Sequence, residues 1–335
     1  MYRAVVAFLL LFSVQASGQD ESNFYTGRTV SILVGSGAGG LTDTSARLIA
    51  RFLERHIPGE PTVIVQNMPG GGGVTMANHV FRSAPRDGTV MGYSSPGMIT
   101  AELLEPNRAK YEGSRLNWIG SAFRSTNTLA VLDTAGAMTL EDARTKEIFL
   151  GASGRGSPLF QIPTLANALL GLRINIITGY EGGSAVVLAM ERGEVDGQAI
   201  ALDFWANLRP EWLSNGSLTH LLRIGPPDLE RAPGVPHLRE LVDSDQDRAL
   251  VDLVEIGFTL GWPLFTPPGV PQDRVVVLRE AFARLVEDPE FARMALSSLH
   301  IELDPIQGDE LTRYVEQALS TPQPLIDEAI RLLGL

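Results

Sequence analysis

The chain has 335 residues, no cysteine and a formal net charge of −12 at pH 7. The excess of acidic side chains argues against nucleic acid or an anionic membrane surface as a partner, and the absence of cysteine excludes disulfides, thiol chemistry and a lipidated cysteine. The chain is longer than a typical single-core domain, so we expect two domains.

The first residues have the pattern of an export signal. Arg3 precedes an apolar run from Ala4 to Val14, and small residues follow from Ala16 to Gly18. A charged start, a short apolar run and small residues mark a secretory signal peptide, and the run is too short to span a bilayer. We therefore predict a cleaved signal peptide over residues 1–18 and a soluble, exported mature chain that does not insert into a membrane.

A glycine-rich turn between a strand and a helix is the first candidate for a binding site. The β-branched run Val30–Val34 predicts a strand, Gly35–Gly40 predicts a loop, and an amphipathic helix is predicted to begin at Leu41. Free backbone N–H groups and the positive end of the helix dipole attract anions at such a turn. We therefore expect a negatively charged small molecule to bind here.

The next two predicted strands end in similar loops. Thr62–Asn67 runs into the glycines of residues 70–73, and Thr89–Tyr93 runs into Ser94–Gly97. A second helix is predicted over Val74–Arg82. Ligands of parallel α/β sheets bind beyond the carboxyl ends of the strands, so these loops together favour one anion site.

The alternation of strands and helices restarts near Trp118 and continues to the C-terminal end. It predicts α/β lobes with largely parallel sheets, the first from residues 24–117 and 255–335 and the second from residues 118–254. The strands predicted in this part are Thr128–Leu132, Ile148–Ala152, Ile174–Thr178, Leu218–Ile224 and Gly257–Phe265. The predicted helices are Thr164–Leu170, Ser184–Arg192, Arg274–Val286, Pro289–Ser298, Gly308–Leu319 and Pro322–Leu333.

Two features of the first lobe have more than one interpretation. The glycines of residues 35–40 formally satisfy a dinucleotide-binding fingerprint, but the second strand ends in Gln66-Asn67 without the acidic residue that would hold a ribose hydroxyl. Asp43 either stabilises the first turn of its helix, or has a functional role, in which it orders the glycine loop or meets a ligand amine or a bound water. We therefore predict no cofactor and leave the role of Asp43 open.

The loop that begins at Ser153 repeats the strand–loop design in the second lobe. A nucleophile elbow would need glycine where Arg155 stands. Arg155 either clamps a carboxylate with two parallel hydrogen bonds or remains solvated, and Tyr180 either stacks on a ligand or fills the lobe. The histidines have no metal-ligand spacing, so we predict no metal site.

Several short sequence motifs follow one another along the chain. No single one is decisive, but together and in this order they are specific for one protein family. They are Gly39–Asp43 with Ala46-Arg47, Val65–Gly73, Ala84–Gly88, Tyr180–Gly182, Gly193–Asp196, Gly261–Pro263, Pro267–Pro271 and Leu285–Pro289. In this order the chain resembles the substrate-binding proteins of tripartite tricarboxylate transporters, the Bug or TctC family. The resemblance covers nearly the whole predicted mature chain.

The resemblance implies a type II periplasmic binding protein fold, in which two Rossmann-like lobes are joined by a two-strand hinge and close a cleft on the ligand. It also implies that loops of the first lobe hold a carboxylate while the second lobe sets specificity. The ligand-binding residues so assigned are Ser36, Gly37, Ala38, Gly39, Gly40, Asp43, Asn67, Gly71, Ser94 and Ser95 in the first lobe, and Ser153, Arg155, Ser157, Tyr180 and Glu181 in the second.

The function implied by the resemblance is transport in the periplasm of a Gram-negative bacterium after Sec export. The protein would capture a di- or tricarboxylate, an acidic amino acid or an aromatic acid and deliver it to the large and small integral-membrane subunits of a transporter. The resemblance implies no enzymatic activity, and we expect a monomer. Two alternatives stay open: a sensory protein that docks on a membrane kinase, and an exported hydrolase, for which no nucleophile–base pair is visible in the sequence.

Overall fold

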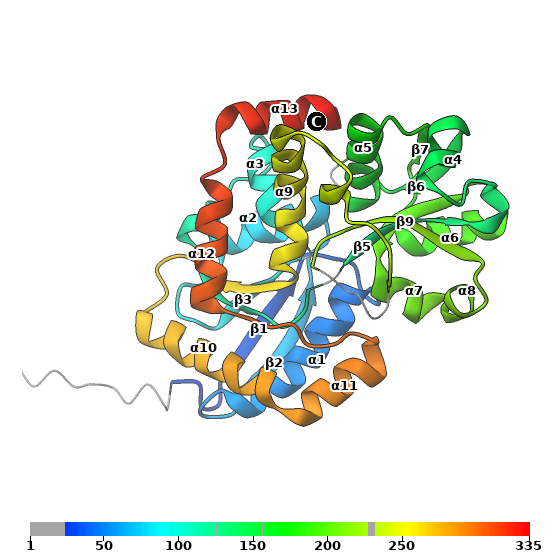
Figure 1. Ribbon diagram of the computed structural model, residues 1–335. Helices are drawn as coiled ribbons and strands as arrows, with labels where there is room; N and C mark the ends of the chain where they lie inside the picture. Colours follow the sequence, from blue (N-terminus) through cyan, green and yellow to red (C-terminus); the bar gives the residue numbers. More distant parts are fainter. Residues whose placement is uncertain (1–23, 95, 125, 156, 227–231) are drawn as a thin grey trace, which may run out of the picture.

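The computed structural model describes residues 24–335 except residues 95, 125, 156 and 227–231. The predicted signal peptide and the predicted ligand residue Ser95 therefore lie outside the described residues. The described chain forms two mixed α/β lobes, each built on one sheet (Figure 1). Within it, no helix is long and apolar enough to cross a membrane.

The first lobe is built on a six-stranded sheet with the order β11-β4-β10-β3-β1-β2. Strands β1, β2 and β3 are parallel, whereas β10 and β11 run antiparallel to β4. The strands are β1 (Thr29–Val34), β2 (Thr62–Asn67), β3 (Val90–Tyr93), β4 (Asn117–Ser121), β10 (Pro263–Thr266) and β11 (Ile306–Gln307). The prediction of largely parallel sheets is wrong here, because the chain leaves after β4 for the other lobe and re-enters at β10 without a βαβ crossover within this sheet.

Helices cover both faces of this sheet. On one face α1 (Leu41–His56) packs with α10 (Gln272–Glu287) and α11 (Pro289–Leu299) around Phe52, Phe282 and Phe291. The other face carries α2 (Val74–Ser83), α3 (Met98–Leu104) and α12 (Gly308–Leu319), with the short turns η2 (Gly71–Gly73) and η3 (Gly113–Arg115) beside them. Because both faces are buried, the strands are apolar along most of their length.

The second lobe is built on a five-stranded sheet with the order β7-β6-β8-β5-β9, in which β5 is antiparallel to both of its neighbours. This sheet is therefore also mixed. Its strands are β5 (Asn127–Leu132), β6 (Ile148–Ala152), β7 (Ile174–Thr178), β8 (Gly197–Ala201) and β9 (Leu218–Ile224). Its helices are α4 (Leu140–Thr145), α5 (Pro158–Leu170), α6 (Gly183–Glu191), α7 (Leu202–Leu208) and α8 (Pro210–Ser214), and η4 (Asp133–Ala135) and η5 (Leu238–Glu240) are short turns.

Two further helices contact both lobes. Residues of α9 (Asp245–Leu260) and α13 (Gln323–Leu333) share one core cluster with Leu104 of α3 and Leu150 of β6. In Figure 1, α13 runs across the top of the molecule above α3 and α9 toward α5. The two helices thus join the layers of the two lobes into one body.

The structure corrects one predicted element. Residues 257–260 were expected to begin a strand, but they complete α9, and the strand β10 starts only at Pro263. Ser244 caps the helix by accepting the Asp247 N–H at 3.0 Å, and Leu250, Val254 and Phe258 continue its buried face. Gly261, with φ 66°, then ends the helix where a Cβ would lie 1.9 Å from the Phe123 carbonyl oxygen.

The division of the chain into lobes stays a prediction, for which the sheets suggest an adjustment. Strand β4 begins at Asn117 and pairs with β10, so the boundary predicted between residues 117 and 118 falls inside a strand of the first sheet. The boundary predicted between residues 254 and 255 falls inside α9. We propose that the first boundary lies after Ser121 and that α9 is shared between the lobes.

Candidate functional site

A cavity of about 490 Å³ lies between the two lobes. The first lobe lines it with the first residues of α1, with the turns after β2 and β3, and with residues of α3 and the loop that follows α3. The second lobe lines it with the loop after β6 and the start of α5. Residues from the β8–α7 junction and from the end of α9 complete the wall. Its polar or glycine lining residues include Thr42, Gly71, Gly72, Gly97, Asn127, Ser153, Gly154 and Ser157, and its charged lining residues are Glu105, Arg108 and Arg155.

The glycine turn after β2 forms part of the wall beside a cation. All residues from Gly70 to Gly73 have positive φ, so this turn exposes backbone where other side chains would be strained. The Nη2 atom of Arg108 lies 2.6 Å from the position that a Cβ on Gly71 would occupy. Arg108 also forms an ion pair with Glu105, the residue at the end of α3. The absence of a side chain at Gly71 therefore lets the guanidinium lie against the turn.

The second lobe contributes the loop that connects β6 to α5. The Ser157 hydroxyl donates to the Gly154 carbonyl at 2.7 Å, which closes a tight turn before the helix. Arg155 donates a hydrogen bond from Nη1 to the carbonyl of Gly334, and its guanidinium carbon lies 5.9 Å from the Phe160 ring centroid. The cavity wall thus contains one arginine from each lobe.

Aromatic and aliphatic side chains form the remainder of the wall. Trp262 lies next to Thr42, to whose Oγ1 its ring N–H donates at 3.1 Å, and Phe204, Phe258 and Leu159 line the cavity as well. A ligand of this cavity would therefore have both apolar side chains and two cationic side chains within its wall.

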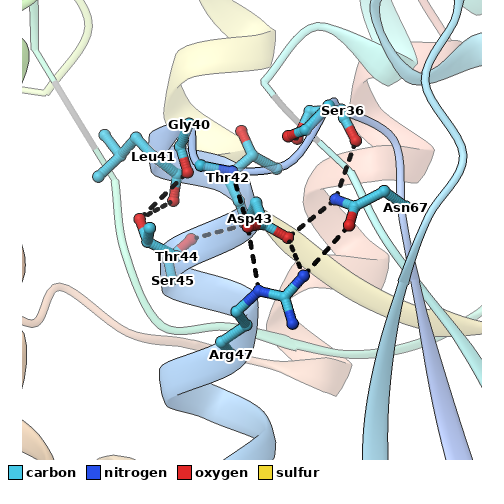
Figure 2. Close-up of polar contacts among 11 residues, drawn as sticks. Ser36, Gly40, Leu41, Thr42, Asp43, Thr44, Ser45, Arg47 and Asn67 are labelled. Carbon is cyan, nitrogen blue, oxygen red and sulfur yellow. Dashed lines mark hydrogen bonds and ion pairs between the residues drawn. The ribbon is translucent and has the colours of Figure 1, made fainter.

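Asp43 does not line the cavity but forms hydrogen bonds that hold the first glycine loop (Figure 2). Each of its carboxylate oxygens accepts two hydrogen bonds: Oδ2 from Gly39 N–H at 2.9 Å and Arg47 Nε at 3.0 Å, and Oδ1 from Arg47 Nη2 at 2.9 Å and Asn67 Nδ2 at 2.8 Å. Burial alone would raise the pKa of Asp43, but these hydrogen bonds and the Arg47 charge together lower it below its ordinary value. The carboxylate therefore orders the glycine loop, which is one of the roles left open above.

Asn67 connects the two glycine loops in the same network. Its Nδ2 also donates to the Ser36 carbonyl at 3.1 Å, and its Oδ1 accepts from Arg47 Nη2 at 3.2 Å. The side-chain polar atoms of Asp43 and Asn67 therefore form their hydrogen bonds with the loops, with Arg47 and with each other. Neither residue lines the cavity.

Of the predicted ligand residues, the structure brings Gly71, Ser153, Arg155 and Ser157 together in the cavity wall. The loop Ser36–Gly40 precedes the lining residues Leu41 and Thr42 but is not itself part of the wall. Ser94 is fully buried, and its hydroxyl has no hydrogen-bond partner within the described part of the chain. Tyr180 packs against the core of the second lobe, and Glu181 is exposed outside the cavity. Whether any of these residues binds a ligand stays a prediction.

Sequence reasoning missed Glu105, Arg108, Phe204 and Trp262. Trp262 belongs to the Gly-Trp-Pro stretch that supported the resemblance, so a signal was present for that residue. Arg108 lies in an ordinary polar loop after α3, and only the packing of α3 brings it to the Gly71 turn. Among the described residues, no group of three or more His, Cys, Asp or Glu side chains could hold a metal ion.

Comparison with known proteins identifies the family. The pattern of the tripartite tricarboxylate transporter family receptor, TctC, matches residues 46–331. Among curated proteins, protein BugT of Bordetella pertussis (strain Tohama I) is 27% identical over 230 residues, which is 66% of this chain and 68% of BugT.

Solved structures share the fold at low sequence identity. The periplasmic binding protein BugD superposes with a TM-score of 0.68 at 22% identity, over 91% of this chain and 98% of BugD. The R. palustris protein Rpa4515 with adipate gives 0.69 at 20% identity over 92% and 97%. MatC from Rhodopseudomonas palustris with bound malate gives 0.66 at 22% identity over 89% and 99%.

These matches confirm both the resemblance and the predicted fold class. The structure has the two-lobed periplasmic binding protein fold with a cavity between its lobes, and the family pattern extends from within α1 to within α13. The chain belongs to the TctC receptor family of tripartite tricarboxylate transporters, the Bug family of substrate-binding proteins.

Proposed function

We propose that this protein captures a small organic dicarboxylate in the cavity between its lobes and delivers it to the membrane subunits of a tripartite tricarboxylate transporter. The observation that carries the proposal is the pair of arginines, Arg108 from the first lobe and Arg155 from the second, in one cavity wall. Because guanidinium groups bind carboxylates through parallel hydrogen bonds, one arginine at each side suits a ligand with two acidic groups.

The charge distribution supports an anionic ligand. The whole chain carries a net charge of −12, so the overall field repels a dicarboxylate. The described cavity wall instead has an excess of positive charge, because it contains two arginines and one carboxylate, that of Glu105. Attraction of the ligand is therefore local to the two arginines of the cavity wall.

The size and lining of the cavity limit the ligand further. A space of about 490 Å³ accommodates an organic acid of metabolite size with bound water, and the apolar wall of Trp262, Phe204 and Phe258 suits a hydrocarbon body. Malate and adipate, which are bound by two structural relatives, are both dicarboxylates. An aromatic diacid fits the same chemistry.

The proposal has no catalytic step. Family and fold are those of substrate-binding proteins. Ser153 is the lining residue considered above as a nucleophile, and no histidine lines the described wall to act as its base. Binding would instead favour the closed arrangement, because a dicarboxylate contacts both lobes at once.

The test is a thermal-shift screen of the mature chain against mono-, di- and tricarboxylates, acidic amino acids and aromatic acids, followed by calorimetric Kd measurement. Ligand at a hundred times Kd should stabilise the fold by about 2.7 kcal/mol. Arg108→Ala and Arg155→Ala should each weaken a bound dicarboxylate by about tenfold or more.

The matched control is Arg173→Ala, which removes an exposed arginine of the second lobe that pairs with Glu147. It should leave Kd unchanged. A folded protein that binds no acid of the panel, or arginine variants that bind like the control, would contradict the proposal. Delivery is tested separately, by uptake of the identified acid into cells with and without the membrane subunits.

A further inference from the structure

Arg155 is held by a helix that does not line the cavity. Its Nη1 donates to the carbonyl of Gly334, the C-cap of α13, which has φ 64° and ψ 36°. The last carbonyls of a helix have no partner within the helix and carry partial negative charge, so they accept a cationic donor well. The Phe160 ring at 5.9 Å lies near the same guanidinium. The orientation of Arg155 is thus fixed from outside the ligand wall.

Helix α13 also packs against α5 and α3, the helices that lie next to Arg155 and Arg108 in the chain. Ile326, Ala329 and Leu333 of α13 are buried in one cluster with Leu165 of α5 and Leu104 of α3. Helix α5 begins at Pro158, just after the Arg155 loop, and α3 ends at Leu104, just before Glu105 and the turn that leads to Arg108. In Figure 1, α13 lies above α3 and ends beside the upper end of α5. The packing of α13 therefore affects elements on both sides of the cavity.

The guanidinium has donors to spare for a ligand. One N–H donates to the Gly334 carbonyl, and for the other N–H groups no acceptor is found among the described residues, so they can donate to a carboxylate in the cavity. An arginine whose plane is already fixed loses less conformational entropy when it binds. The carbonyl of Gly334 thus gives Arg155 an orientation that a free surface arginine would lack.

We propose that α13, through the Gly334 carbonyl, is a positioning element that aims Arg155 at the distal carboxylate of the ligand and so sets the preference for dicarboxylates over monocarboxylates. This inference rests on the proposed function, because it assumes that the cavity binds a dicarboxylate. Arg155 is the contact residue in it, and Gly334 acts only through Arg155.

The decisive variant is Gly334→Ala. A Cβ on Gly334 would lie 3.1 Å from Arg155 Nη1, so the guanidinium must shift. Gly171→Ala is the matched control: Gly171 caps α5 with φ 65° and ψ 35°, and its Cβ would meet nothing within 4 Å. Both substitutions therefore introduce the same left-handed alanine strain, and only one moves Arg155.

Calorimetry should compare acids in which a methyl group replaces the distal carboxylate: adipate with hexanoate, and malate with 2-hydroxybutyrate. Gly334→Ala should weaken the dicarboxylate of a pair by about threefold or more and leave its monocarboxylate unchanged, whereas Gly171→Ala changes neither. In an Arg155→Ala background, Gly334→Ala should have no further effect on either acid.

Equal weakening of both acids, persistence of the effect without Arg155, or equality with Gly171→Ala would overturn the positioning role. A wild-type protein that binds no dicarboxylate would instead overturn the proposed function. If Gly334→Ala does not fold, Arg155→Lys replaces it as the test. A lysine keeps the charge but has no fork to hold the carbonyl and a carboxylate together, so selectivity for the dicarboxylate should fall, and full retention would overturn the inference.

Discussion

Asp43 shows how a buried carboxylate is tolerated behind a binding loop. It is 2% exposed, and both of its oxygens accept two hydrogen bonds. An amide at this position has only one acceptor oxygen, and its NH₂ group would face the donors of Arg47, Asn67 or Gly39. Asp43→Asn should therefore destabilise the fold by about 2–3 kcal/mol in urea unfolding at pH 7. The comparison variant is Asp142→Asn, which alters a more exposed carboxylate at the start of α4 and should cost less.

The Asp43 effect has a defined pH dependence. Its pKa in the folded state lies below the ordinary value of 3.8, so the folded state favours the charged carboxylate more than the unfolded state does. The stability that Asp43 contributes is therefore complete above the ordinary pKa and is lost as the pH falls through the folded-state pKa. The difference between wild type and Asp43→Asn should shrink in that acidic range. A difference that stays constant down to acid unfolding would show that the charge is not its source.

A substitution at Gly71 tests the role of Arg108, as the substitution at Gly334 tests that of Arg155. A Cβ there would meet Arg108 Nη2 at 2.6 Å, and because the end of an arginine side chain is flexible, the guanidinium rather than the turn should move. Gly71→Ala should weaken dicarboxylate binding by about fivefold, as judged by calorimetry. Gly136→Ala, at φ 65° with nothing within 4 Å of its Cβ, carries similar strain far from Arg108 and should leave Kd unchanged. Equal effects of the two variants would mean that strain alone matters.

At the scale of elements, α3 is anchored by a carboxyl group that resists ionisation. Glu102 accepts the Gly113 N–H at 2.9 Å, and burial raises its pKa to about 7, against the opposing effect of that hydrogen bond, with Glu112 adding to the rise. Between the ordinary value of 4.5 and about 7 the folded state binds more protons than the unfolded state, so stability falls as the pH rises through this window. The link between α3 and η3 is thus strongest in mild acid.

Glu102→Gln should remove this part of the pH dependence, because a glutamine still accepts the Gly113 N–H but does not ionise. Wild type should lose on the order of 1 kcal/mol of unfolding free energy between pH 5 and pH 8, and the variant should lose less and be the more stable of the two at pH 8. Urea midpoints at both pH values measure this. Glu141→Gln changes an exposed carboxyl group of α4, which is not among the groups that shift the Glu102 pKa, and is the control. Parallel pH curves for wild type and Glu102→Gln would contradict the assignment.

The elements that sequence predicted well are those whose signals are local. The bounds of β6, β7 and β9 agree with the predicted strands, because each is a short run rich in apolar residues that is followed directly by Ser153, Gly179 or Gly225. The strand predicted from Gly257 was wrong. Its glycines and aromatic residues fit a strand, but the helix that Ser244 caps continues through these residues, because they extend the buried face of α9. Arg108 could not be found for a similar reason: the packing of α3, rather than any motif, places it at Gly71.

At the scale of the whole molecule, the lobes contact each other at two helix ends. Besides the Arg155 contact with Gly334, Asn207 of α7 donates to the Leu299 carbonyl and its Oδ1 lies 2.8 Å from His300 Nδ1 at the end of α11. Both contacts join a side chain of the second lobe to a helix C-terminus of the first. His300 has φ 54°, a left-handed conformation that turns the chain at this contact. These side-chain contacts thus bridge the two lobes that line the shared cavity.

The Asn207 contact lies outside the cavity wall, so its effect on binding should differ in kind from that of Arg155. Asn207→Ala removes a contact that exists only while the lobes are together, and it should shift the population toward a more open arrangement. Since apparent affinity scales with the closed fraction, every ligand should lose the same factor, about three- to tenfold. Calorimetry should therefore show equal losses for adipate and hexanoate, unlike the selective loss expected for Gly334→Ala. Asn215→Ala, at an exposed turn after α8, is the control.

Solution scattering shows whether a loss of affinity in Asn207→Ala comes from opening of the lobes or from a change in the cavity itself. If Asn207→Ala opens the lobes, the ligand-free variant should have a larger radius of gyration than wild type, and saturating dicarboxylate should return it to the wild-type value. Restoration follows because a ligand held by Arg108 and Arg155 contacts both lobes and favours their closed arrangement by its differential affinity. A weakened variant with an unchanged radius of gyration would place the effect on the cavity itself, and an enlarged radius that ligand does not reverse would mean that the dicarboxylate binds to one lobe alone.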